Sequence, residues 1–278
     1  MAPRGPGGTP LRYEVLALRT PTLPPATTTN TMVMWGEAVA VVEPATPHPE
    51  EQRRLLDVLD RLAAEGRAVA AILLTHHHAD HVGFARRLRD RTGAPIAAHR
   101  ATAERLPFAV DRMLDDGAVL DLGGGAALVA VHTPGHAPGH LLFHDPAGRV
   151  GYAGDLVAGE GTILIDPDDG GDMAAYLASL DRARALDLSR LVPAHGPALT
   201  APRVVFDHYR DHRAMREARV LAALGDHPRG PSDLVPQVYD DVPKALYPLA
   251  EKSLRAHLDK LVAEGRVEVR RGRYRRVG

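Results

Sequence analysis

Four histidines and an aspartate crowd one short stretch of the chain, from Leu73 to Gly83, which reads LLTHHHADHVG. Imidazole and carboxylate groups bury poorly unless something pairs with them, so packing alone does not explain this density of polar side chains. Metal binding does explain it. On a tight loop, His76 and His78 can converge on one ion while Asp80 and His81 converge on a second, since both ligand types suit zinc. Two ions about 3.5–4 Å apart need further ligands from elsewhere.

The composition narrows the chemistry. The chain has no cysteine, which excludes disulfides and thiolate ligands, so any metal must be bound by histidine and carboxylate. Its 278 residues, 45% of them hydrophobic, suffice for one large domain and a small one. No apolar stretch reaches the roughly 18–20 residues of a membrane span. The N-terminal segment MAPRGPGGTPLRY lacks the apolar core of a signal peptide, so we expect a cytoplasmic protein without a membrane partner.

Strands and helices alternate along most of the chain. Short apolar runs predict buried strands at 15–18, 32–42, 68–74, 127–131, 141–143, 150–153 and 191–192. Apolar residues at helical spacing predict helices that run from Pro49 to a stop at Gly66, over 82–92, near 172–186 and over 202–224. The histidine stretch therefore lies on the loop that follows a buried strand.

Three later strands also run into short polar loops. These loops are HTPGH, ending at His136, GD, ending at Asp155, and PAH, ending at His195. Loops at strand ends, held by a rigid scaffold, are where sites are commonly built. We therefore expect these three residues to supply the missing ligands.

The ordered set of motifs resembles the metallo-β-lactamase superfamily at all seven of its two-metal positions. The resemblance implies an α/β (α+β) fold, a four-layer αβ/βα sandwich with the site along one edge. It also implies two zinc ions, with manganese or iron as alternatives. By this resemblance the first metal is bound by His76, His78 and His136, the second by Asp80, His81 and His195, and Asp155 bridges both.

The resemblance is more specific in three places. A bridging aspartate such as Asp155 is the pattern of the glyoxalase II, lactonase and nuclease branches, whereas the antibiotic-hydrolysing enzymes lack it. The stretch GEGTILIDPDDGGDMAAYLASL, the helix HYRDHRAMREARVLAAL and the C-terminal segment are similar to the β-lactamase-like protein 2 group. Characterised animal members of that group are single-stranded RNA endonucleases. Ala194 departs from the glycine that relatives often carry.

The C-terminal segment predicts a separate module. Helices expected at 231–239 and 247–264 precede a hairpin at 267–274 that turns at Arg271-Gly272, which suggests a winged helix. We expect a catalytic domain over 1–217 and a winged-helix-like domain over 218–278. The arginines of the last residues, RVEVRRGRYRRVG, either contact phosphates or form a solvated end. The aromatic content of 4% leaves few platforms on which bases could stack.

The implied mechanism uses a hydroxide that bridges the two zincs, since metal binding lowers the pKa of water from about 15.7 towards about 7. Asp80 or Asp155 would pass a proton to the leaving group, and both are candidate catalytic residues. The group resemblance places the helix that carries His212 and Arg213 beside the mouth of the site. These two side chains either contact the substrate or lie on a solvated face.

Several functions remain open at this point. The leading hypothesis is a two-zinc hydrolase whose substrate is single-stranded RNA, with a small-molecule thioesterase or lactonase of glyoxalase II type as the alternative. The THxHADH stretch also resembles persulfide dioxygenases, which use a single iron. A nucleic-acid-binding sensor is a further alternative from a different class. The module at the C-terminus could also serve a homodimer.

Overall fold

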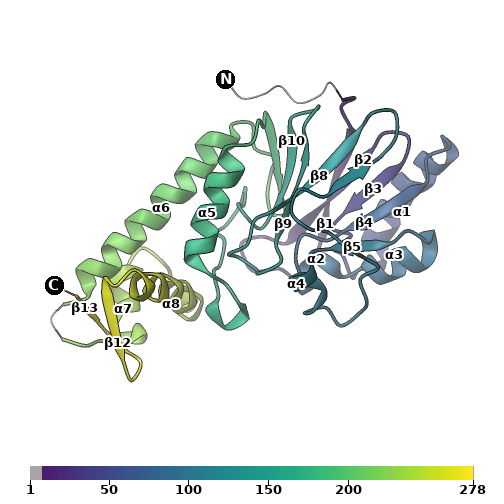
Figure 1. Ribbon diagram of the computed structural model, residues 1–278. Helices are drawn as coiled ribbons and strands as arrows, with labels where there is room; N and C mark the ends of the chain where they lie inside the picture. Colours follow the sequence, from purple (N-terminus) through teal and green to yellow (C-terminus); the bar gives the residue numbers. More distant parts are fainter. Residues whose placement is uncertain (1–7, 226, 278) are drawn as a thin grey trace.

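The computed structural model describes residues 8–225 and 227–277. Residues 1–7, on which part of the signal-peptide argument rests, lie outside this range. Two β-sheets pack face to face, and helices cover both outer faces (Figure 1). The first sheet has the strand order β1 (Arg12–Arg19), β2 (Thr28–Trp35), β3 (Val39–Val42), β4 (Val69–Leu73), β5 (Ile96–Ala98) and β6 (Arg112–Met113). The second has the order β11 (Arg190–Pro193), β10 (Val150–Gly154), β9 (Leu141–Asp145), β8 (Ala127–His132) and β7 (Val119–Asp121).

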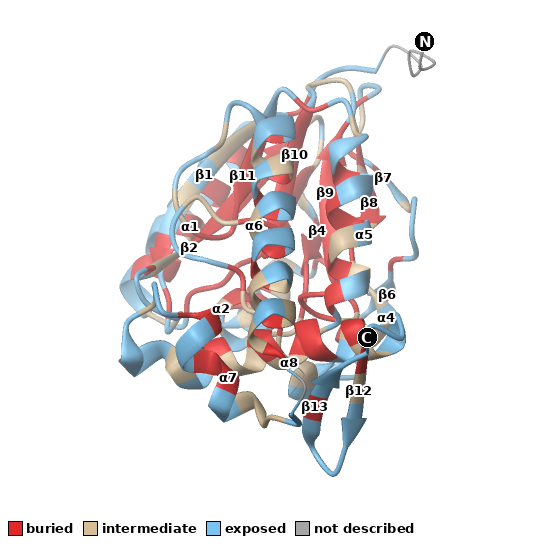
Figure 2. Cartoon of the chain, turned by 90° about the vertical axis from the view of Figure 1, so that its left-hand side faces the viewer, coloured by how far each residue is buried: buried red, intermediate tan, exposed pale blue. Residues whose placement is uncertain are grey.

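The alternation of side chains along the strands produces the layers. In β2, Met32 and Met34 belong to the core between the two sheets, whereas Val33 and Trp35 pack on the opposite face. That second face is covered by α1 (Pro49–Ala64) and α3 (Ala85–Thr92). The second sheet is covered in the same way by α5 (Met173–Arg184) and α6 (Pro202–Ala223). Figure 2 shows buried residues concentrated in the strands and exposed residues on the outer side of α6. The predicted four-layer sandwich is confirmed.

Two elements that were predicted as continuous are each divided into two in the structure. The strand expected over 32–42 is a hairpin, in which β2 and β3 are antiparallel and the Gly36 amide donates to the Ala38 carbonyl at 3.1 Å. The helix expected over 82–92 is divided into the short α2 (Ala79–Val82) and α3. The helical hydrogen bonds are interrupted there because the amides of Gly83 and Phe84 donate instead to the carbonyls of Ala45 and Pro44, at 3.1 and 2.9 Å.

The short elements α4 (Arg100–Ala103), η1 (Pro167–Asp169) and β5 to β7 were not expected from the sequence. They contain two to four residues each, too few for an apolar period to stand out. Among them, η1 matters for the site because it lies between α8 and the histidine stretch. No helix in the described part of the chain is both long and apolar enough to cross a membrane.

The C-terminal module comprises α7 (Pro231–Val238), η2 (Lys244–Leu246), α8 (Tyr247–Ala263) and the hairpin β12 (Val267–Arg270) and β13 (Arg273–Arg276). It has a hydrophobic core of its own, to which the last turns of α6 contribute Val220 and Leu224. The winged-helix prediction is confirmed. Because α6 runs without a break across residues 217 and 218, the proposed domain boundary stays a prediction. The hairpin lies at the end of the molecule away from the sandwich (Figure 1).

Candidate metal centre

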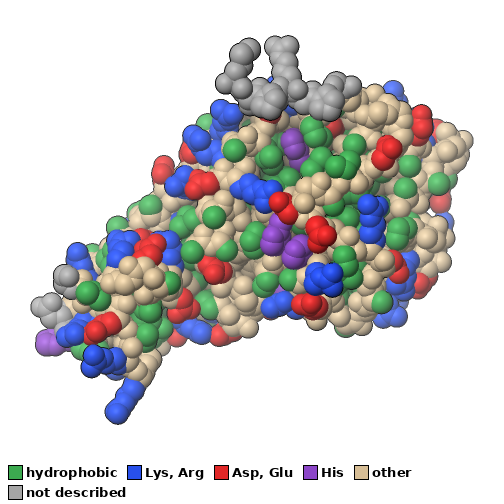
Figure 3. Space-filling model, in the orientation of Figure 1, with side chains coloured by type: hydrophobic (Ala, Val, Ile, Leu, Met, Phe, Trp, Pro, Cys, Tyr) green, Lys and Arg blue, Asp and Glu red, His purple; other side chains and the backbone are tan. Residues whose placement is uncertain are grey.

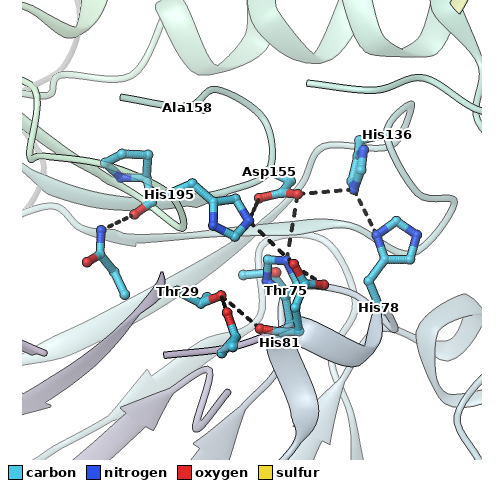
Figure 4. A network of polar contacts seen from close by, with 12 residues as sticks. Thr29, Thr75, His78, His81, His136, Asp155, Ala158 and His195 are labelled. Atoms are coloured by element: carbon cyan, nitrogen blue, oxygen red, sulfur yellow. Dashed lines mark hydrogen bonds and ion pairs between the residues drawn. The ribbon is translucent and has the colours of Figure 1, made fainter. Parts of the chain in front are cut away.

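Four strands deliver the predicted site residues to one edge of the sandwich. The loop and helix after β4 carry His76 to His81, and the loops after β8, β10 and β11 carry His136, Asp155 and His195. Because the carboxyl ends of these strands meet at the same edge, side chains as distant in sequence as His76 and His195 become neighbours. Figure 4 shows Asp155 lying between His195 and His136. All seven predicted residues are therefore brought together.

Three imidazoles form the first group. The Nε2 atom of His76 lies 2.9 Å from Nδ1 of His78, and Nε2 of His136 lies 3.2 Å and 3.1 Å from these two atoms. The remaining nitrogen of His136, Nδ1, lies 2.8 Å from the Leu164 carbonyl, to which it must donate. Its Nε2 therefore presents a lone pair to the other two rings. Three converging imidazole nitrogens form a site that a cation would fill.

Asp80, His81 and His195 form the second group. The Nε2 atom of His81 lies 3.5 Å from Asp80 Oδ1, and Nε2 of His195 lies 3.7 Å from Asp80 Oδ2. Since His195 Nδ1 donates to the Thr28 carbonyl at 2.9 Å, its Nε2 also presents a lone pair. These atoms lie within 4.8 Å of one another, which is close enough for a single ion to reach all three.

Asp155 lies between the two groups. Its Oδ1 is 3.4 Å from Nε2 of His195, whereas its Oδ2 is 3.4 Å from Nε2 of His136 and 3.6 Å from Nε2 of His81. Oδ1 is buried and has no hydrogen-bond partner in the described part of the chain. One carboxylate thus offers an oxygen to each group, as a bridging ligand must.

The electrostatics of this pocket suit divalent cations. Burial lowers the pKa of His76 and His136 well below the ordinary value, so both rings are neutral, as ligands must be. Burial also lowers the pKa of His81, but the carboxylates of Glu43, Asp155 and Asp80 outweigh it and raise that pKa to about 10. The three carboxylates around His81 thus favour positive charge in this pocket. The donor set fits the metal pair that the motifs imply.

Glu43 is a site residue that the sequence reasoning missed. It is fully buried, follows β3 directly and has a φ angle of 51°. Its carboxylate accepts hydrogen bonds from Thr75 and from Tyr152, the latter at 2.6 Å, and lies 3.0 Å from Nδ1 of His81. Thr75 in turn lies 2.8 Å from Nδ1 of His76. Glu43 thus orients one histidine from each group. A charged residue directly after the apolar run VAVV was the available signal.

Asp169, on η1, is a second residue that was missed. One of its oxygens lies 2.6 Å from Nε2 of His78, and Nε2 of His77 lies 3.2 Å from both. His77 lies between two predicted ligands in the sequence, and its contact with Asp169 places it beside His78 in the wall of the site. The neighbouring acids of this loop are tied to α8, because Lys252 bonds Asp166 at 2.6 Å and Arg255 bonds Asp168 at 2.7 and 2.8 Å.

His140 has a structural role beside the metal groups. The ring is fully buried, its Nδ1 lies 2.8 Å from Thr133 Oγ1, and its Nε2 accepts the backbone N–H of Asp155 at 3.0 Å. His140 therefore fixes the backbone of the residue between the two metal groups. An added Cβ at the preceding Gly154, where φ is 52°, would lie 2.6 Å from this ring.

The two predicted substrate-contact residues lie on α6 near the site. Arg213 is only 3% exposed, which excludes the solvated-face alternative for it, and His212 is half-buried. Burial, followed by the charge of Arg213, lowers the pKa of His212 to about 4. Both side chains line a pocket that also touches Thr162 and Leu164, two residues of the metal cleft.

The arginines of the C-terminal hairpin do not reach the metal centre in this structure. Arg275 pairs with Glu268 and Arg273 with Asp233, both within the C-terminal module. Figure 3 shows lysine and arginine side chains, with acidic ones among them, at the end of the molecule that carries this hairpin.

Comparisons with known proteins agree with this architecture. Residues 24–195 match the metallo-beta-lactamase superfamily, and residues 231–274 match the beta-lactamase associated winged helix domain. A beta-lactamase-like protein 2 homolog from Caenorhabditis elegans is 30% identical over 86% of this chain and 80% of its own length. A hydroxyacylglutathione hydrolase from Fuscovulum blasticum is 36% identical over 49% of this chain and 51% of its own. A crystal structure of a metallo-beta-lactamase family protein from Thermus thermophilus covers 95% of this chain and 98% of its own, with 25% identity and a TM-score of 0.75.

Proposed function

The chain belongs to the metallo-β-lactamase superfamily and carries its associated winged helix, and on that premise we propose a two-zinc hydrolase of esters or thioesters of small organic acids. One observation carries the two-metal part. The oxygens of Asp155 face His195 on one side and His136 and His81 on the other, at 3.4 to 3.6 Å. A carboxylate placed in this way is better suited to bridge two ions than to bind one.

The ligand assignment follows the two groups. His76, His78 and His136 would hold one ion, Asp80, His81 and His195 the other, and Asp155 both. When bound, the metal pair supplies an activated water and neutralises charge that develops on the substrate oxygen. The chain's own residues orient these ligands. Glu43 does so for His76 and His81, Asp169 for His78, and backbone carbonyls for His136 and His195.

The leaving group needs a proton, and either candidate carboxylate can take one from the attacking water and pass it on. Asp80 and Asp155 both line the cleft, and their side chains are 16% and 11% exposed, so each reaches the reacting atoms while remaining mostly shielded from solvent. We propose that one of them carries the proton to the departing oxygen or sulfur atom.

The size of the cleft favours a small substrate. It measures about 270 Å³ and is lined by the segment from Pro21 to Ala26, by the segment from Gly161 to Leu164 and by the metal-site residues. Such a volume suits part of a small organic molecule. Hydroxyacylglutathione hydrolases among the relatives act, by their name, on a molecule of this kind. Acyl transfer to water is therefore the reaction we favour.

Single-stranded RNA is the second candidate. It is favoured by the exposed arginines of β12 and β13, since Arg270, Arg271 and Arg276 lie without a carboxylate within ion-pair distance among residues 8–225 and 227–277. Against it stands the position of this hairpin, at the end of the molecule away from the sandwich (Figure 1). A cytoplasmic location and a homodimer stay predictions.

The deciding experiment measures turnover of S-lactoylglutathione and cleavage of a fluorescent single-stranded RNA by zinc-loaded protein. We expect thioester hydrolysis that is lost in Asp155→Asn and after treatment with a chelator. RNA cleavage by the wild type alone would instead favour the nuclease. Equal rates for wild type and Asp155→Asn on both substrates would refute the hydrolase, and one iron per chain in the purified protein would refute the two-zinc assignment.

A further inference from the structure

A second pocket adjoins the metal cleft, at the junction between the sandwich and the winged helix. It has a volume of about 220 Å³ and shares Leu23, Pro24, Thr162 and Leu164 with the cleft. Its other wall comes from α6, α8 and the segment between α7 and α8. A molecule bound with its scissile bond in the cleft would therefore extend naturally into this pocket, which we call the junction pocket.

Three buried polar atoms without a hydrogen-bond partner belong to residues that line the junction pocket. Among the described residues, Nε of Arg213, Nε of Arg216 and the hydroxyl of Tyr239 are inaccessible to solvent and make no hydrogen bond, and the three residues line the pocket. Buried polar groups are nearly always paired in folded proteins, so a cluster of unpaired donors requires an explanation. All of these atoms are hydrogen-bond donors, and two belong to cations. An anionic group on a ligand therefore suits this wall best.

The two arginines differ in how their charge is balanced. Arg216 forms a two-point contact with Asp241, at 2.7 and 2.8 Å, and is neutralised by it. Arg213 donates to the Ile163 carbonyl and lies 5.3 Å from the centre of the Tyr176 ring, but no carboxylate within residues 8–225 and 227–277 lies within ion-pair distance of it. Burying a cation without an anion is unfavourable. Arg213 thus presents an uncompensated charge to the pocket.

The rest of the lining is apolar. Leu164, Val242, Leu249 and Ala250 line the pocket, and Leu23 and Leu246 line it with side chains that remain 53% and 38% exposed. A ligand bound here would cover these apolar side chains. The ligand must therefore combine an apolar chain with an anionic group.

We propose that the junction pocket binds a carboxylate carried on a short apolar chain, and that Arg213 receives this carboxylate. For the reaction, this inference rests on the proposed function, because the bound chain would be the acyl part of the substrate and its ester or thioester bond would lie in the metal cleft beyond Leu164. For binding alone it requires no turnover. The enzyme would then select diacid half-esters or half-thioesters over neutral esters of equal length.

The test is calorimetric titration of zinc-loaded protein with octanoate and with 1-octanol, its neutral counterpart. We expect octanoate to bind at least about tenfold more tightly than octanol, and Arg213→Gln to remove this preference. Arg210→Gln is the matched control, because Arg210 lies on the same helix but is exposed and pairs with Asp181. A carboxylate bound to the metals alone would lose no affinity in Arg213→Gln, and that result would overturn the proposal.

A second variant keeps the test decisive where Arg213→Gln does not fold. Leu246→Glu places a negative charge at a pocket residue that is already 38% exposed, so the fold should tolerate it. We expect octanoate affinity to fall severalfold and octanol affinity to change little. The dinucleotide UpU forms a further arm, and tighter binding of UpU than of octanoate would overturn the proposal in favour of nucleic acid.

The outcomes separate this proposal from the hydrolase itself. Arg213-dependent octanoate binding without thioester turnover would retain the junction pocket and reject the hydrolase. Thioester turnover with octanoate affinity unchanged in Arg213→Gln and Leu246→Glu would retain the hydrolase and reject the pocket.

Discussion

The contact between Asp169 and His78 gives a prediction about metal affinity. Asp169 Oδ2 accepts a hydrogen bond from Nε2 of His78 at 2.6 Å, while Nδ1 of the same ring faces His76 and His136. The carboxylate fixes both the orientation of the ring and the nitrogen that carries the proton, leaving Nδ1 free to bind a metal. Asp169→Asn keeps an oxygen acceptor but removes the charge, so it isolates the electrostatic part of this contact.

The expected loss of zinc affinity follows from the usual effect of a carboxylate that hydrogen-bonds a metal-binding histidine. Removing a hydrogen-bonded partner behind a metal ligand typically weakens binding about 10- to 100-fold, or roughly 1.4–2.7 kcal/mol. The side chain of Asp169 is 43% exposed, so water screens its charge and the lower limit applies. We expect Asp169→Asn to weaken binding of one zinc about tenfold, measured by competition with a chromophoric chelator. Two zinc ions bound with wild-type affinity would refute this reasoning.

The same contact extends to the winged helix. Arg255 on α8 holds Asp168, the residue next to Asp169, with two hydrogen bonds of 2.7 and 2.8 Å. Arg255→Gln should therefore loosen η1 and weaken zinc binding by a few-fold, less than Asp169→Asn. Arg273→Gln is the matched control, since Arg273 is exposed on the hairpin and contacts only the C-terminal module. The visible spectrum of the cobalt-loaded protein should change in Arg255→Gln and not in this control.

Three further predictions concern stability. Tyr152→Phe removes a donor from the buried Glu43 carboxylate and should cost about 1–3 kcal/mol in urea unfolding; a change below about 0.5 kcal/mol would contradict this. Gly135→Ala should cost more than about 3 kcal/mol, because φ is 130° and the new Cβ would lie 2.3 Å from the Tyr176 backbone, whereas Gly93→Ala, with nothing within 4 Å, should cost only about 1–2 kcal/mol. Burial, followed by the charge of Arg213, lowers the pKa of His257 to about 3. As the pH falls, His257 therefore takes up a proton in the unfolded chain before it does so in the folded protein. The folded protein loses stability for this reason between pH 6.5 and about 3. We therefore compare how much the free energy of unfolding decreases from pH 7 to pH 5 in the two proteins. The decrease should be about 2 kcal/mol smaller in His257→Leu than in the wild type, and equal decreases would contradict the assignment.

The sandwich and the seven clustered residues could be predicted because their signals are local. Each strand is an apolar run, and each candidate ligand follows such a run within a few residues, so its place at a strand end can be read from the sequence. His257 shows the limit of this reasoning. Nothing in the sequence distinguishes it from an exposed polar residue of the helix expected over 247–264, but the ring is fully buried and neither nitrogen has a partner in the described part of the chain. Its burial depends on how α8 packs, which the sequence does not state.

Arg213 was ambiguous for a related reason. The buried residues of α6 recur at alternating spacings of four and three, as one face of a helix requires, and they are Pro202, Phe206, Tyr209, Arg213, Arg216 and Val220. Two of the six positions on this face hold arginine. If only apolar residues are counted, the buried face ends at these arginines, and both are predicted to be exposed to solvent. The face is recognisable only once α5 and the C-terminal module are seen to cover it.

The acidic run DPDDGGD shows why the positions of the ligands could be predicted while the residues that orient them could not. Three aspartates of similar character lie within four positions, and nothing local distinguishes them. In the fold, Asp166 is held by Lys252 and Asp168 by Arg255, which leaves Asp169 directed at His78. Lys252 and Arg255, which lie on α8 more than eighty positions further along the chain, thus determine which aspartate contacts His78. We therefore propose that the winged helix acts on the metal centre through Asp169, the residue that its own contacts leave free, and this role requires no nucleic acid.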